Sequence, residues 1–400
     1  MRYLSAHYVY PVSSPPLRNG VVCLDDDGFV VDIIDSGGCL KEREKLEFYN
    51  GILVPGFINA HCHLELSHLR HTVQPHGGLP AFILSVGDMR KASREIIFAA
   101  AKAADREMTE NGIVGAGDIS NNADTFSIKQ NSRIRYHTFI ELFGLDDSRS
   151  KEIFAAAENV KNEYDNAGMP ASIAPHAVYS VSQALWEMLR QSYQASPPQV
   201  ISMHHQEESN EKNGPLADAL RKKGLLAGKI KNQKSKIKNC LQKASRCLLV
   251  HNTFSTKNDL ARYTHPAGQF YFVLCPRSNL FIQDRLPDFS LFCAQQLRQS
   301  VCIGTDSLAS NTHLSVLEEM KIIQQYAPEI PFDLLLQWAT DNGAKALGFH
   351  HLGSMEKGKA PGINLITHID FVHRRLTNES TIKLLVPGGK QLSVAWSNMV

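Results

Sequence analysis

The pattern of apolar and polar positions divides the chain into a middle region that alternates strands with helices and two ends that are typical of short strands. Near the start, the apolar segments 21–24 and 29–34 flank three aspartates and a glycine, which predicts a hairpin. Segments 363–366, 369–372 and 381–385 show the same pattern near the end. Two strand-rich ends, residues 1–52 and 351–400, therefore flank a different middle region of residues 53–350.

The middle region predicts repeated strand–helix units. Residues 81–110 and 151–166 carry apolar side chains at helical spacing, and a last helix over 331–347 ends before Gly348. Repeated units of this kind favour a closed (β/α)8 barrel of class α/β. No GxGxxG motif follows the first strand, which argues against an open dinucleotide-binding sheet. The expected strands are 53–60, 113–119, 136–143, 172–175, 200–204, 247–250, 270–274 and 301–304.

Composition and charge narrow the classes of function. The chain has 42 lysines and arginines against 40 acidic residues, so its net charge of +2 predicts no strong attraction to nucleic acid or membrane. No apolar run approaches the roughly 20 residues that span a bilayer, and the first residues lack the apolar core of a signal peptide. The eight cysteines form no CxxC pair. We expect a reduced, cytoplasmic protein.

One segment departs from this balance. Residues 221–246 carry ten lysines and arginines and no acid. No aromatic residue interleaves them, which argues against stacking on nucleic-acid bases. We interpret the segment as a solvated outer face of the barrel.

Several of the predicted strands end in polar residues that can bind a metal ion. Alternate side chains of a strand share a face, so two histidines at the end of the first strand can point the same way. The carboxyl ends of barrel strands are where active sites lie, and imidazole and carboxylate bind ions such as zinc. An isolated charge after an apolar run is costly unless it is paired or metal-bound. These residues are His61, His63, His204 or His205, His251 and Asp306.

Several of these segments resemble motifs of the amidohydrolase superfamily. Residues 55–63, Pro-Gly-Phe-Ile-Asn-Ala-His-Cys-His, are similar to its first metal motif, and residues 175–180 and 304–307 resemble its fourth-strand and eighth-strand motifs. The resemblance covers nearly the whole chain. It implies a (β/α)8 barrel over residues 53–350, which the strand–helix repeat also predicts, and a small β-sandwich formed from residues 1–52 and 351–400 at the two chain ends.

Within the superfamily, the motifs are similar to those of the aminohydrolases and chlorohydrolases that act on nitrogen heterocycles. This branch implies one divalent metal ion, with zinc favoured and iron as the alternative. The two-metal branches carry a carboxylated lysine on strand four, where this chain offers His176 and no lysine. The implied metal ligands are His61, His63, His205 and Asp306.

The adjacent histidines at 204 and 205 leave two registers open. His205 shares a strand face with Ile201 and Met203, and it places Glu208 in the family's His-x-x-Glu motif, so His205 is favoured. The resemblance implies that Glu208, His251 and Asp306 handle protons and that His176 contacts substrate. Glu65 resembles a position in the first motif of aminodeoxyfutalosine deaminases, which implies contact with a substrate hydroxyl or amine.

The resemblance implies a hydrolytic deaminase of a heterocyclic amine. A nucleoside derivative that carries adenine, such as aminodeoxyfutalosine, is the leading candidate substrate; hydroxide formed at the metal would attack it and ammonia would leave. The alternatives are an amidase or dehalogenase of the same fold, and a barrel that only binds, although every ligand position is filled. The expected partner is a small heterocyclic molecule, with neither nucleic acid nor membrane involved. Barrels of this family often form homodimers, but the sequence indicates no interface.

Overall fold

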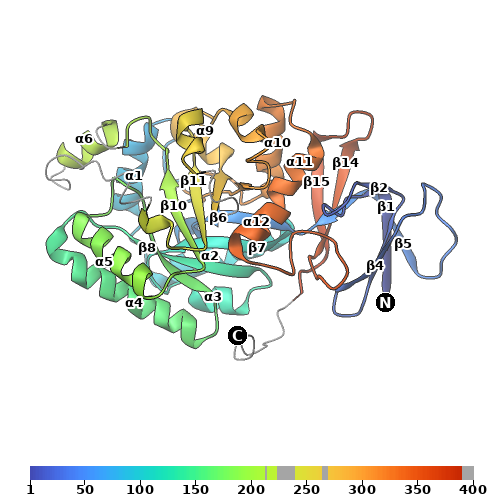
Figure 1. Ribbon diagram of the computed structural model, residues 1–400, viewed down its shortest axis with the longest axis horizontal. Coiled ribbons are helices and arrows are strands. Elements are labelled where there is room, and N and C mark those ends of the chain that lie inside the picture. Colours follow the sequence, from blue (N-terminus) through green and yellow to red (C-terminus); the bar gives the residue numbers. More distant parts are fainter. Residues whose placement is uncertain (212–213, 223–238, 264–268, 390–400) are drawn as a thin grey trace.

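The computed structural model of the chain describes residues 1–211, 214–222, 239–263 and 269–389. Parallel strands lie at the centre of its larger part, and helices surround them (Figure 1). The strands form two four-stranded parallel sheets, in the orders β6-β7-β8-β9 and β10-β11-β12-β13. Their bounds are β6 (Phe57–Cys62), β7 (Ile113–Ser120), β8 (Arg135–Leu142), β9 (Ala171–Pro175), β10 (Val200–His205), β11 (Arg246–His251), β12 (Phe270–Leu274) and β13 (Val301–Ile303).

Two seams join these sheets into a (β/α)8 barrel, which confirms the expected fold. At one seam, the backbone N–H of His204 in β10 donates to the carbonyl of His176 after β9, at 2.8 Å. At the other, the N–H groups of Thr305 and Asp306 donate to the carbonyl of His61 at 3.0 and 3.1 Å. The last strand thus returns to the first. Since both seams lie where strands end, they also hold histidines and an aspartate of the expected site close together.

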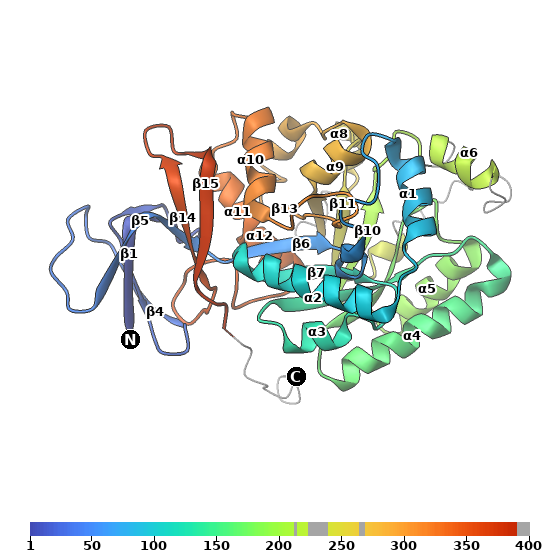
Figure 2. The same ribbon diagram turned by 180° about the vertical axis from the view of Figure 1, so that it is seen from behind.

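Helices lie on the outside of the strands in both views (Figures 1 and 2). The segment 81–110, expected as one helix, forms two, and Ser93 begins the second because its hydroxyl accepts from the N–H of Ile96. In the described part of the chain, no helix is long and apolar enough to cross a membrane. Most of the basic segment 221–246 lies outside the described residues. The α-helices are α1 (Gly78–Met89), α2 (Arg94–Glu110), α3 (Phe126–Asn131), α4 (Ser150–Asn166), α5 (Gln183–Ala195), α6 (Pro215–Lys222), α8 (Lys257–Ala261), α9 (Pro276–Gln283), α10 (Val316–Tyr326), α11 (Phe332–Ala339) and α12 (Asp341–Leu347).

Strands from both chain ends meet beside the barrel. We expected a small β-sandwich, and hydrogen bonds join these strands into one seven-stranded sheet of order β15-β14-β5-β1-β3-β4, with β2 paired to β1. Figure 2 shows β14 and β15 between the N-terminal strands and the barrel helices. The bounds are β1 (Arg2–Val9), β2 (Leu17–Arg18), β3 (Val21–Leu24), β4 (Val30–Ile34), β5 (Leu46–Pro55), β14 (Ile363–Asp370) and β15 (Arg375–Val386).

The junction between this sheet and the barrel differs from the sequence prediction. The first barrel strand was expected to begin at Leu53, but residues 46–55 belong to β5 and the barrel strand begins at Phe57. Gly56 separates the two strands in a crowded position, where a Cβ atom would lie 2.7 Å from the carbonyl oxygen of Pro361. Only glycine fits such a close backbone approach.

Both faces of the barrel strands are buried in apolar contacts. On β10, Ile201 and Met203 belong to the cluster that includes Leu185 of the outer helix α5. The alternate residue Val200 packs instead with residues from other strands, such as Val250 of β11, in a second cluster inside the barrel. Alternation therefore gives each strand one face toward the helices and one toward the barrel interior.

Candidate metal centre and active site

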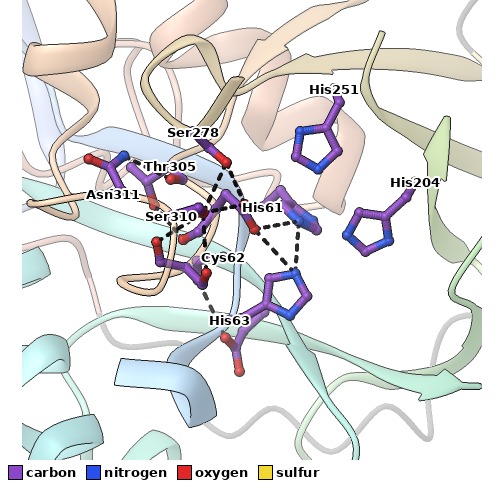
Figure 3. A network of polar contacts seen from close by, with 12 residues as sticks. His61, Cys62, His63, His204, His251, Ser278, Thr305, Ser310 and Asn311 are labelled. Atoms are coloured by element: carbon purple, nitrogen blue, oxygen red, sulfur yellow. Dashed lines mark hydrogen bonds and ion pairs between the residues drawn. The ribbon is translucent and has the colours of Figure 1, made fainter. Parts of the chain in front are cut away.

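His61 and His63 end β6 with their rings facing each other. The pairing of β6 with β7 shifts register between Asn59 and Cys62, and this bulge lets His61 turn inward after the inward-facing Ala60. The Nε2 atoms of the two histidines lie 3.1 Å apart. Figure 3 shows both rings in one group with the rings of later strands.

Asp306 follows β13 and presents one carboxylate oxygen to these histidines. Its Oδ1 lies 3.6 Å from Nε2 of His61 and 3.4 Å from Nε2 of His63. Its Oδ2 accepts hydrogen bonds from the hydroxyls of Ser278 and Ser310, each at 2.6 Å. Burial alone would raise the pKa of Asp306, but the neighbouring imidazoles outweigh it and hold this pKa well below its usual range. The group is therefore a carboxylate at neutral pH.

The structure places His204, not the expected His205, in this group. The His204 ring centre lies 5.0 Å from that of His61 and 5.5 Å from that of His63. Its Nδ1 donates to the carbonyl of His176 at 3.0 Å, which leaves Nε2 for the centre of the site. His205 points to the helix side of β10, where its Nδ1 lies 3.0 Å from Oδ1 of Asn252. The shared face with Ile201 and Met203 was correctly inferred, but that face is the outer one.

The acidic residue that faces the cavity is also one position earlier than expected, Glu207 in place of Glu208. Gln206 has a left-handed backbone (φ +52°), and Glu207 after it lines the cavity with Oε1 3.5 Å from Nε2 of His251. The expected Glu208 is not among the cavity-lining residues, and its carboxylate accepts from the N–H of Leu216 at 3.3 Å. The His-x-x-Glu spacing is kept, because His204 and Glu207 are three residues apart, as His205 and Glu208 are.

Burial sets the protonation state of the cavity groups. Burial, together with the charges of Asp306 and Glu211, raises the pKa of Glu207 well above its usual value and so favours the protonated form of its carboxyl group. Burial lowers the pKa of His251 to about 4 and that of His176 to about 3, so both imidazoles are neutral. A protonated acid, an ionised carboxylate and neutral imidazoles thus share one site.

His251 and His176 flank His204 inside the cavity. The His251 ring stacks on that of His204 with centres 5.3 Å apart, and its left-handed backbone (φ +76°) aims it inward after Val250. The His176 ring lies 4.5 Å from that of His204 and meets Phe143 edge to face. The structure therefore brings both predicted residues to the cavity wall.

Glu65 lies one layer behind the cavity wall. Its Oε1 accepts from the guanidinium of Arg90 at 3.1 Å, and its Oε2 accepts from the backbone N–H of Asn121 at 3.0 Å. Arg90, Asn121 and Glu141 themselves line the cavity. Glu65 thus orients the residues that face a substrate, where the sequence predicted a direct contact.

Sequence analysis missed several residues of the cavity wall. A signal for Glu141 was present in the sequence, because Glu141 is a polar residue near the end of an apolar strand, as the histidines are. Arg90 and the apolar face of α1 gave none, since only the fold brings this helix over the barrel mouth. The apolar wall residues from α1 and the turn before it are Leu66, Leu79, Phe82, Ile83 and Val86.

The donor set fits one divalent cation. In the described part of the chain, His61, His63 and His204 form a group whose ligand atoms all lie within 4.8 Å of one another, as do His61, His251 and Asp306. Neutral imidazoles and one carboxylate match the ligands of zinc or iron. Cys62, between the first two histidines, is not part of either group, because its thiol faces Asp118 on the other side of the strand at 3.4 Å.

Comparison with known proteins agrees with this geometry. Residues 52–392 match the model of the amidohydrolase family. The chain belongs to that family. An adenosine deaminase of Helicobacter pylori is 26% identical over 398 residues, covering 92% of this chain and 95% of the relative.

Solved structures of the family share the fold. The aminofutalosine deaminase of Helicobacter pylori in complex with methylthio-coformycin matches with a TM-score of 0.74 and 22% identity, over 92% of this chain and 93% of that one. The atrazine chlorohydrolase TrzN of Arthrobacter aurescens TC1, complexed with zinc, matches with a TM-score of 0.74 and 15% identity, over 98% and 97%.

Proposed function

We propose that this amidohydrolase is a hydrolytic deaminase with one divalent metal ion, zinc in preference to iron. The observation that carries the proposal is the convergence of three imidazoles and one carboxylate at the mouth of the barrel, beside a cavity that also holds a protonated acid. The proposed ligands are His61, His63, His204 and Asp306.

The residues around the ion divide the proton transfers between them. His61, His63, His204 and Asp306 would hold a divalent ion, which would supply a nucleophile at neutral pH by lowering the pKa of a water molecule. Asp306, ionised because of its low pKa, would accept the proton that this water releases and pass it to the departing amino group, which leaves as ammonia. Glu207, protonated because of its raised pKa, donates to the substrate ring nitrogen next to the carbon under attack. His251, neutral and 3.5 Å from Glu207, stabilises the intermediate by hydrogen bonding.

The shape and chemistry of the cavity support an adenine-bearing nucleoside derivative, such as aminodeoxyfutalosine, as substrate. The aromatic ring of Phe143 and the imidazole of His176 offer a surface for a flat base. Arg90, Asn121 and Glu141 offer donors and acceptors for hydroxyl groups. The names of the similar proteins, adenosine deaminase and aminofutalosine deaminase, support the same class.

The proposed organisation assigns residues 57–350 to the catalytic barrel and residues 1–55 and 351–389 to the accessory sheet. The enzyme would act on a small cytoplasmic metabolite without nucleic acid or membrane. Analytical ultracentrifugation distinguishes a monomer from a homodimer.

The test is metal analysis of the purified protein followed by a screen for ammonia release. The compounds are adenosine, 5′-deoxyadenosine and aminodeoxyfutalosine, compared with guanine, cytosine, aminotriazines and a chlorotriazine. We expect about one metal ion per chain and stoichiometric ammonia from at least one adenine-bearing compound. Asp306→Asn serves as the control that keeps the fold and loses turnover. Absence of metal, or chloride release in place of ammonia, would contradict the proposal.

A further inference from the structure

Asp118 and Lys129 form a buried ion pair behind the strand end that carries the first two histidines. Nζ of Lys129, on α3, lies 2.5 Å from Oδ2 of Asp118 near the end of β7, and both side chains have no exposed surface. The ammonium also donates to the hydroxyls of Ser120 at 2.8 Å and Thr138 at 3.2 Å. Burial alone would lower the pKa of Lys129, but Asp118 and Tyr164 raise it above its usual value, so the lysine remains charged.

The other oxygen of Asp118 holds the backbone on both sides of His63. Oδ1 accepts from the N–H of Leu64, the residue after His63, at 2.7 Å. It also accepts from the thiol of Cys62, the residue before His63, at 3.4 Å.

The energetics of this pair favour a positioning role over a stabilising one. A buried ion pair brings little net stability compared with apolar residues of the same size, because both charges lose their hydration. Here the ion pair holds the Asp118 carboxylate against the backbone amide of Leu64, directly beside the proposed ligand His63. Outer groups that orient metal ligands in this way are worth about 10- to 100-fold in metal affinity.

We propose that Asp118, held by Lys129, is a positioning residue that fixes the backbone around His63 so that its imidazole reaches the metal centre. The inference rests on the proposed metal centre. Neither Asp118 nor Lys129 is among the residues that line the described cavity, so their effect passes through the Leu64 amide and not through substrate.

Two double variants separate positioning from charge pairing. Asp118→Asn with Lys129→Met removes both charges but keeps an acceptor for the Leu64 amide. Asp118→Ala with Lys129→Met removes both charges and the acceptor. The single variant Lys129→Met leaves a buried carboxylate without its partner and should melt at the lowest temperature of the three.

The readouts are the melting temperature of the metal-free proteins, the zinc dissociation constant by chelator competition, and hydrogen exchange of the Leu64 amide. We expect the double variants to melt within a few degrees of each other. The alanine double variant should bind zinc at least about 10-fold more weakly than the asparagine one and exchange its Leu64 amide faster.

The outcomes distinguish this inference from the proposed function. Equal zinc affinity and equal Leu64 protection in the two double variants would overturn the inference while leaving the metal centre intact. Failure of the wild-type protein to bind zinc or iron would overturn the metal centre, and with it a role for Asp118 in metal binding. Rescue of both readouts by asparagine supports positioning, because a purely structural role would follow melting temperature alone.

Discussion

The hydroxyl of Ser278 lies 2.6 Å from Oδ2 of Asp306, so the carboxylate reaches the histidines with only its other oxygen. Ser310 holds the same oxygen at the same distance, and the two serines are 2.9 Å apart (Figure 3). This arrangement fixes the direction of the proposed metal ligand before any ion binds.

Removing these hydroxyls should therefore weaken metal binding. We expect Ser278→Ala and Ser310→Ala each to reduce zinc affinity about 10-fold, because a freed Asp306 oxygen can rotate away. Chelator competition measures this effect. Ser202→Ala is the matched control, since it removes a buried barrel hydroxyl that makes no contact with Asp306. Equal affinities in all three variants would show that the serines do not orient the carboxylate.

The two adjacent histidines should behave differently. His204→Gln removes a proposed ligand, so we expect loss of bound metal by elemental analysis and loss of turnover. His205→Gln removes contacts with Asn252 and Tyr263 on the helix side, so it should keep its metal and lose about 1 kcal/mol of unfolding free energy. If His205→Gln lost the metal and His204→Gln kept it, the assignment of β10 faces would be reversed.

The two adjacent glutamates make a second matched pair. Glu207→Gln cannot donate a carboxyl proton, so turnover should fall about 10²- to 10⁴-fold while the metal content stays unchanged. Glu208→Gln alters a carboxylate that contacts the Leu216 amide outside the cavity, and we expect turnover close to that of the wild type. Initial-rate measurements at saturating substrate decide between them, and similar losses in both variants would contradict the proton role of Glu207.

A buried histidine outside the cavity should make the fold sensitive to acid. Burial, aided by Arg246 and Arg135, lowers the pKa of His137 to about 3, against about 6.5 in an unfolded chain. Between these values only the unfolded chain binds the proton, so stability present above pH 6.5 is lost as the pH falls. His137→Asn should remove up to about 1.4 kcal/mol per pH unit of this slope.

Urea unfolding of the metal-free protein between pH 4 and 8 measures that slope. His373→Asn is the control, because the side chain of His373 is 70% exposed. Parallel curves for wild type and His137→Asn would show that His137 does not contribute.

The sequence predicted the barrel and the location of the site, because both depend on periodicity. Apolar runs separated by helical patterns place strands, and polar residues at their ends place the site at the barrel mouth. His61, His63, His251 and Asp306 were found in this way and His176 from its resemblance to the fourth-strand motif, and the structure brings them together.

The His205 and Glu208 assignments each lie one residue beyond the side chain that lines the cavity, His204 and Glu207. Every residue of β10 is buried, so alternation alone cannot tell which face lines the barrel interior and which faces the helices. The left-handed backbone at Gln206 then turns the side chain of Glu207 toward the cavity, and the residue types do not predict this backbone conformation. Arg90 could not be found locally, since only tertiary packing brings it 3.1 Å from Glu65.

The backbone pairing between His61 and Asp306 also determines the stage of protein synthesis at which the site can form. These residues pair through their backbones, yet 245 positions of chain separate them, so a ribosome finishes nearly all of the barrel before the carboxylate emerges. Until then the nascent chain contains the three proposed histidine ligands but lacks the Asp306 carboxylate. Binding of the proposed metal ion by all four ligands therefore requires that translation has passed the final barrel strand.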